Sequence, residues 1–151
     1  MEYFLKNIGM ARDKGSKNLI KEFEDFGSCF WNERSKVWFS NSNFGGNVSK
    51  GDIIIQYIPC SYKSAQFAGR IVGVYRVISE KIFLPNKQWK VYFEVENLCL
   101  KFSKKSKEKT ILHIKQVIKN IPKAIQCGCA KISVQEAEKI IEQIKKSEEV
   151  E

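Results

Sequence analysis

The chain has 151 residues, a length typical of one domain that buries roughly two thirds of its unfolded surface. With 43% hydrophobic residues, 12% aromatic residues and 3 prolines, the composition excludes a disordered or collagen-like chain. The net charge of +9 favours a polyanionic partner, and residues 101–123 alone hold eight lysines against one acidic residue. Only four of the 26 basic residues are arginines, so the lysine excess fits either such a partner or an AT-rich genome.

The absence of an apolar segment and the cysteine content indicate the compartment of the protein. No apolar run reaches the roughly 18 residues needed to span a bilayer, and residues 1–9 lack a basic region followed by an apolar core. The five cysteines are odd in number and lie in core-like strings, which favours a reducing compartment over a disulfide framework. We therefore expect a cytoplasmic protein that does not enter a membrane, and we favour a monomer.

In the first half of the chain, residues 3–8 predict a short strand. Ser16 can cap a helix with apolar residues at helical spacing, and Gly27 ends that helix. Residues 28–44 are rich in aromatic residues interrupted by polar ones. Residues 51–57 alternate as a strand, which Pro59 ends. That alternation predicts one face that consists of Ile53, Ile55 and Tyr57.

Two further strands are predicted in the middle of the chain. Residues 67–79 form the longer one, and its two glycines suggest tight curvature or a close backbone approach. Residues 89–95 form the other, with one apolar and one polar face. Strict alternation in the longer strand puts on one face Gly69, Ile71, Gly73, Tyr75 and Val77.

The last third predicts a lysine-rich loop over residues 103–109, a helix over residues 111–121, and a C-terminal helix. Ser133 and Glu136 form a capping box at the start of that last helix. Its predicted inner stripe consists of Val134, Ala137, Ile140, Ile141 and Ile144. We predict one domain over residues 1–146, followed by an acidic, frayed tail over residues 147–151.

Signals for catalysis and metal binding are weak. Cys127 and Cys129 could bind a metal with His113, but paired C-x-x-C knuckles are missing, so buried cysteines are the simpler interpretation. Asp52 follows Gly51 at a strand start, where a role in a turn is expected. No nucleophile signature and no phosphate-binding glycine loop is present. We therefore expect neither a metal nor a cofactor, and an enzyme is the less favoured interpretation.

The aromatic residues offer a binding hypothesis. Trp31, Trp38 and Tyr57 could stack on a planar ligand, because base stacking on an aromatic ring contributes roughly 1–3 kcal/mol. Polar neighbours such as Ser40 and Asn41 could hydrogen-bond to the edge of a base. The alternative, that these rings are ordinary core, stays open at this point.

The order of these pieces resembles a known family. The run Lys50-Gly51-Asp52-Ile53-Ile54-Ile55-Gln56-Tyr57 resembles the "KGDxxxxY" strand of EVE domains, members of the PUA-like superfamily. The run 67–73 with 77–79 is similar to their next strand, and residues 89–95 to the one that follows. Residues 128–141 resemble the closing strand-to-helix segment.

The resemblance implies an α+β fold, a curved mixed pseudo-barrel of five to six strands with flanking helices. Proteins of the superfamily generally bind RNA or DNA, and EVE domains, like the related YTH domains, are thought to hold a modified base. Tyr57 matches the tyrosine that ends the strand, and Ile58, Pro59, Cys60 and Ser61 match the loop at the pocket mouth. Gln126 stands where many members have an arginine. The Lys/Glu set of the related ASCH hydrolases has no match here.

The leading hypothesis is therefore a non-enzymatic module that binds DNA or RNA carrying a modified base. The predicted base-binding residues are Trp31, Trp38, Ser40, Asn41, Tyr57, Ile58, Pro59, Cys60, Ser61 and Gln126. The predicted phosphate-attracting residues are Lys101, Lys104, Lys105, Lys107 and Lys109. One alternative is a small hydrolase or transferase that acts on a nucleoside-like or amide substrate through Cys60 or Glu94. Another is an interaction module whose basic helix binds an acidic protein.

Overall fold

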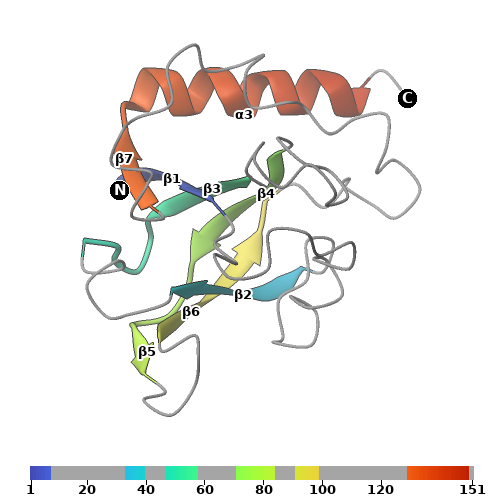
Figure 1. The fold of residues 1–151 in the computed structure, drawn as a ribbon. Coiled ribbons are helices and arrows are strands. Elements are labelled where there is room, and N and C mark those ends of the chain that lie inside the picture. Colours follow the sequence, from blue (N-terminus) through green and yellow to red (C-terminus); the bar gives the residue numbers. More distant parts are fainter. Residues whose placement is uncertain (8–32, 40–46, 58–70, 84–90, 99–128, 150–151) are drawn as a thin grey trace, which may run out of the picture.

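We describe a computed structural model of the chain over residues 1–7, 33–39, 47–57, 71–83, 91–98 and 129–149. These residues form a single mixed sheet of seven strands and a C-terminal helix, an α+β fold (Figure 1). The helices predicted over residues 16–26 and 111–121 lie outside the described ranges. The elements are β1 (Tyr3–Asn7), β2 (Arg34–Phe39), β3 (Ile53–Tyr57), β4 (Ile71–Val77), β5 (Ile82–Phe83), β6 (Val91–Asn97), β7 (Cys129–Ile132) and α3 (Val134–Glu149).

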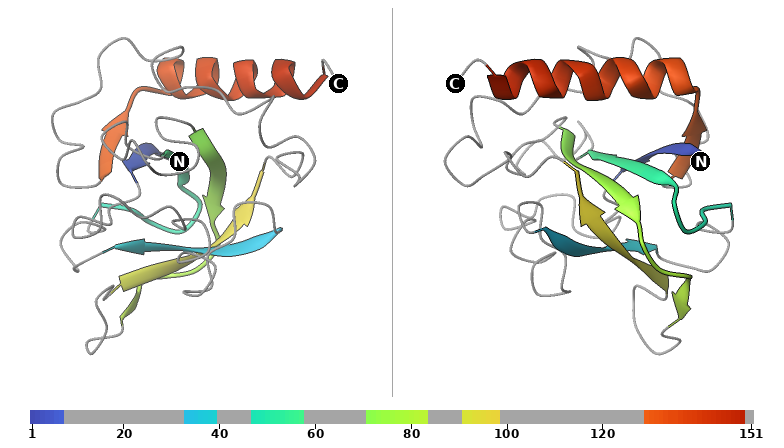
Figure 2. Two further views of the ribbon diagram at one scale, coloured as in Figure 1. Left: turned by 45° about the vertical axis from the view of Figure 1, so that its right-hand side comes forward. Right: turned by 180° about the vertical axis from the view of Figure 1, so that it is seen from behind.

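The strand order in the sheet is β2-β6-β4-β3-β1-β7, and β5 pairs with β6. β1 and β3 are parallel, and the other described pairs are antiparallel. Helix α3 lies along the half of the sheet that contains β7, β1 and β3 (Figures 1 and 2). The seven strands exceed the five to six that the resemblance implies, and β2 and the two-residue β5 are strands that the sequence analysis did not predict.

Helix α3 packs on the sheet through its apolar stripe. Ser133 Oγ accepts a hydrogen bond from the Glu136 N–H at 3.1 Å, which confirms the predicted cap. Val134 was wrongly placed in the stripe: it is 46% exposed, because as the first helical residue it lies off the centre of the buried face. The helix runs to Glu149 and so includes residues 147–149 of the predicted tail. The stripe residues buried against the sheet are Ala137, Ile140 and Ile144, with Ile141 partly buried.

The predicted face of β3 is confirmed, and that of β4 is only partly correct. Ile53, Ile55 and Tyr57 all belong to the core beneath α3. On β4 the pairing shifts: Gln56 pairs with Gly73, whereas Tyr57 pairs with Ile71. The residue between them has no partner on β3 in this register, so alternation breaks and Ile71 faces α3 while Gly73 faces the other side.

The Gly51-Asp52 turn fastens the start of β3. Gly51 has a φ of +95°, in the left-handed region that glycine adopts readily. The Asp52 carboxylate is buried and accepts hydrogen bonds from the Glu2 N–H at 2.9 Å and the Ser49 N–H at 2.8 Å. Asp52 therefore has the structural role in a turn that the sequence predicted.

The face of the sheet opposite α3 is concave. The Lys6 ammonium on β1 lies 4.9 Å from the centroid of the Phe39 ring on β2, although the two strands are not neighbours in the sheet. Contact between distant strands requires the sheet to curl. Within the described ranges, no helix has both the length and the apolar character that crossing a membrane requires.

Candidate ligand-binding site

A row of residues crosses four strands on the concave face. Lys6 pairs with Cys129 on β7 and with Gln56 on β3, and Gln56 pairs in turn with Gly73 on β4. Residues directly opposite each other in a sheet point to the same side, so all four positions face the curled interior. The row places a cation, a thiol and an amide side by side.

Lys6 is the most unusual member of this row because it is buried, with 3% of its surface exposed. Its ammonium donates a hydrogen bond to the Asn7 backbone carbonyl at 2.9 Å and lies over the Phe39 ring. Among the described residues no carboxylate forms an ion pair with it. A buried ammonium without an anionic partner is costly, and the polarised ring of Phe39 compensates only part of that cost.

Burial also shifts the two titratable groups of the row. Desolvation lowers the pKa of Lys6 from 10.5 to about 8, and the nearby Cys129 thiol opposes this shift. Desolvation raises the pKa of Cys129 from 9.0 to about 11, with Lys6 opposing it. At neutral pH the lysine is therefore mostly charged and the thiol is protonated. A protonated thiol beside an ammonium is a poor metal ligand, which argues against the metal interpretation of Cys129.

The Gln56 amide is buried beside Lys6, with 3% of the residue exposed. Its neighbour Gly73 leaves space that the Tyr75 ring fills, since a Cβ at Gly73 would collide with that ring. The sequence predicted tight curvature or a close backbone approach at the glycines, whereas the group that requires a glycine at position 73 is a side-chain ring.

We use the term Lys6 corner for the four residues Lys6, Phe39, Gln56 and Cys129. Each of them lies at or next to the end of its strand. β1 ends one residue after Lys6, β2 ends at Phe39, β3 ends one residue after Gln56, and β7 begins at Cys129. Several predicted base-binding residues lie within four positions of these strand ends in the sequence, although they are outside the described ranges. They are Ser40 and Asn41 after Phe39, Ile58 to Ser61 after Tyr57, and Gln126 three positions before Cys129.

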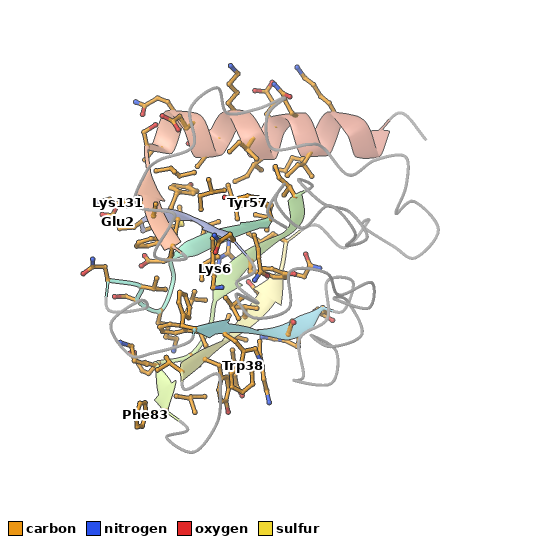
Figure 3. The ribbon with its side chains drawn as sticks, in the orientation of Figure 1. Glu2, Lys6, Trp38, Tyr57, Phe83 and Lys131 are labelled. Carbon is orange, nitrogen blue, oxygen red and sulfur yellow. The ribbon has the colours of Figure 1, made fainter. Side chains whose placement is uncertain are left out.

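Trp38 and Tyr57 do not face each other. Trp38 is buried on the side of β2 away from the concave interior, with its ring 4.6 Å from the Tyr92 ring. Tyr57 lies in the core beneath α3. Figure 3 shows Lys6 between them, with Tyr57 on the α3 side and Trp38 beyond β2. The two rings therefore do not line one pocket together, because β4 and β6 separate their strands and the rings lie on opposite sides of the sheet.

The other predicted site residues are mostly outside the described ranges. Among them are Trp31 and the five loop lysines, Lys101, Lys104, Lys105, Lys107 and Lys109, as well as His113 and Cys127. Cys60, the first residue of the enzymatic alternative, lies outside as well. Glu94, its second residue, is exposed in an open depression of about 410 Å³ that Arg34 and Lys36 also line.

Sequence reasoning missed Lys6, Gln56 and Phe39. Lys6 follows three apolar residues and precedes Asn7 at the end of β1, and a lysine at such a position is normally expected to face solvent. The burial of Gln56 could have been predicted from the pattern of β3. The alternation that buries Ile55 and Tyr57 on one face places Gln56 on the other face, together with the large apolar residue Ile54. Two apolar faces indicate a strand buried on both sides.

Comparison with known proteins shows the fold but names no activity. No model of a known protein family matches the chain, and no curated protein matches it. The NMR structure of Rpa0253 from Rhodopseudomonas palustris is similar, with 13% identity, a TM-score of 0.54, and coverage of 96% of this chain and 94% of that chain. A hypothetical protein from Leishmania major is similar too, with 12% identity, a TM-score of 0.53, and coverage of 97% and 96%.

A third similar structure is the crystal structure of Atu2648 from Agrobacterium tumefaciens. It shares 13% identity and a TM-score of 0.50, and the match covers 97% of this chain and 93% of that chain. All three matches extend over nearly the whole of both chains. They therefore support a fold shared with these three proteins.

Proposed function

We propose that this protein is a nucleic-acid-binding module of the PUA-like kind, and that it holds a base at the Lys6 corner. The observation that carries the proposal is the buried Lys6-Gln56 pair beside Phe39. A polar heterocycle suits this set, because an ammonium and an amide can hydrogen-bond to its edge, and it would take the place of the Lys6 ammonium over the Phe39 ring.

Two further observations support the proposal. The four segments that resemble EVE domains overlap β3, β4, β6 and the β7-α3 unit, in the order of the resemblance. The predicted pocket residues in three separate segments lie one to four positions along the sequence from β2, β3 or β7. We infer that these predicted residues contribute to base binding, and that the lysines of residues 101–109 attract the phosphate backbone.

Titration of labelled single-stranded oligonucleotides tests this function. We expect binding that weakens linearly in log–log coordinates as salt increases, since lysines release counterions from phosphates. Replacing Lys101, Lys104, Lys105, Lys107 and Lys109 by glutamine should weaken binding to all sequences alike and flatten the salt slope. Absence of binding to RNA and DNA even at low salt, where backbone attraction is strongest, would overturn the proposal.

A further inference from the structure

We propose that the groove between α3 and the sheet binds a short apolar peptide and holds it by its two charged ends. The groove has a volume of about 460 Å³, which falls within the range of about 300–1,000 Å³ that is usual for ligand sites. Residues of α3 form one wall, and residues near the ends of β1, β3 and β4 form the other. The groove lies on the face of the sheet that α3 covers, whereas the Lys6 corner lies on the opposite face. It is therefore a second site, independent of the proposed function.

The base of the groove is apolar. Tyr3 and Ile53 are paired in register on neighbouring strands and belong to the core, so little of their surface is open to a ligand. The apolar surface that a ligand can cover is provided by Leu98, which is 39% exposed, and by the partly buried Ile141 of α3. Removing such surface from water favours binding. The middle of the ligand should therefore be apolar.

Two opposite charges stand on the helix wall. Glu138 and Lys145 both line the groove from α3. Within the part of the chain that the structure describes, neither side chain forms an ion pair. Glu142, which lies between them, is paired with Lys146 at 3.4 Å. The wall thus offers one carboxylate and one ammonium that are available to a ligand carrying both charges.

The wall formed by the strands has the same polarity. A row in register crosses it from Tyr3 through Ile53 to Arg76, and this order leads away from β7. Because α3 begins directly after β7, Glu138 is nearer to β7 than Lys145 is. Arg76 therefore strengthens the basic end of the groove. Its pairing with Glu96, at 2.8 Å, uses one of the five donors of the guanidinium and leaves others for a second carboxylate.

The spacing of the two charges sets the length of the ligand. Glu138 and Lys145 are two helical turns apart, which corresponds to about 10 Å along the helix axis. An extended peptide of about three residues spans the same distance. Its terminal ammonium can then reach Glu138 while its terminal carboxylate reaches Lys145, and its apolar side chains cover the base of the groove. A longer peptide would leave one of these charges without its partner.

Titration of the ¹⁵N-labelled full chain with trileucine tests this site, and the backbone resonances of Leu98 and Ile141 report on binding. Acetylating the peptide's amino end or amidating its carboxyl end should each weaken binding about two- to fivefold, the effect of one exposed ion pair. Glu138→Gln should abolish the effect of acetylation alone, and Lys145→Gln that of amidation alone. Lys139→Gln is the matched control, because Lys139 is exposed on α3 outside the groove, and it should preserve both effects.

Three results would overturn the proposal. The first is the absence of saturable shifts with trileucine at millimolar concentration. The second is equal binding of the free and the doubly capped peptide, since the groove would then be an apolar surface that ignores the charged ends. The third is a capping effect that persists in Glu138→Gln and in Lys145→Gln. The oligonucleotide titration is a separate test, because the base is proposed to bind on the other face of the sheet.

Discussion

The Lys6 ammonium lies over the Phe39 ring, 4.9 Å from its centroid, although three strands separate β1 from β2 in the sheet. The contact connects β1 and β2 across the concave face of the sheet. It places a positive charge in a position where apolar side chains are usual. Because Lys6 has 3% of its surface exposed, its charge is expected to lower the stability of the unliganded protein.

Lys6→Met should therefore raise the free energy of unfolding. The folded-state pKa of Lys6 is about 8 against 10.5 for the ordinary side chain. Below about pH 8 both states are protonated and folding buries the full charge. Between about pH 8 and 10.5 only the unfolded state holds the proton, so this group makes stability rise with pH.

The gain from Lys6→Met should consequently be largest near pH 7, at about 3 kcal/mol, and fall toward zero near pH 10.5. Urea unfolding of both proteins across that pH range measures the difference. Lys131→Met serves as control and should show no such trend. A variant less stable than wild type at pH 7 would contradict the account of Lys6 as a buried, poorly compensated charge.

Cys129 should react slowly with alkylating reagents. Burial raises the pKa of its thiol to about 11 from 9.0, so the thiolate fraction at neutral pH falls about 100-fold. Peptide mapping by mass spectrometry after iodoacetamide treatment measures this site alone. In urea the rate should return to that of an ordinary thiol. Equal rates in the folded and unfolded protein would mean that the thiol is neither buried nor shifted.

Asp52→Ala should lower the free energy of unfolding by about 2 kcal/mol, because the Glu2 and Ser49 N–H groups each lose a charged acceptor. Asp52→Asn should cost less, since its single side-chain oxygen can still serve one of these donors. Glu138→Ala on the exposed face of α3 is the control, with a change expected within about 0.5 kcal/mol. If Asp52→Ala changes the free energy of unfolding as little as Glu138→Ala does, the Asp52 carboxylate does not stabilise the turn.

Gly73→Ala and Gly51→Ala should differ in both size and cause. At Gly73 a Cβ collides with the buried Tyr75 ring, so we expect a loss of about 1–3 kcal/mol that Tyr75→Leu partly relieves in the double variant. At Gly51 the space is open and only the positive φ opposes a side chain, which costs about 1 kcal/mol. Strictly additive effects of Gly73→Ala and Tyr75→Leu would argue against the collision.

Much of the fold could be predicted because its signals are local. Alternation in residues 53–57 and 91–95, and the Ser133 cap before an apolar stripe, indicated β3, β6 and α3 correctly. β2 was not predicted as a strand, because Val37, Trp38 and Phe39 are all buried and show no alternation. The irregularity that turns Ile71 to the α3 face depends on the pairing of β4 with β3, which the sequence of β4 alone does not specify.

The candidate site was harder to predict because it depends on curvature. Lys6 is buried only because the sheet brings Phe39 across from β2, a contact between residues that are far apart in the chain. Aromatic content alone suggested Trp38 and Tyr57, yet the direction of each ring follows from strand register: Trp38 pairs with Tyr92 on the outer side of β6, and Tyr57 faces α3.

The central claim is that the Lys6 corner binds the base, and the ammonium resonance of Lys6 tests it most directly. Titrating ¹⁵N-labelled full-length protein with a short uracil-containing oligonucleotide should shift this resonance in a saturable manner and raise the pKa of Lys6 above about 8, because a bound carbonyl oxygen stabilises the charged form. Saturable binding that leaves the resonance and the pKa of Lys6 unchanged would place the base elsewhere and contradict the claim.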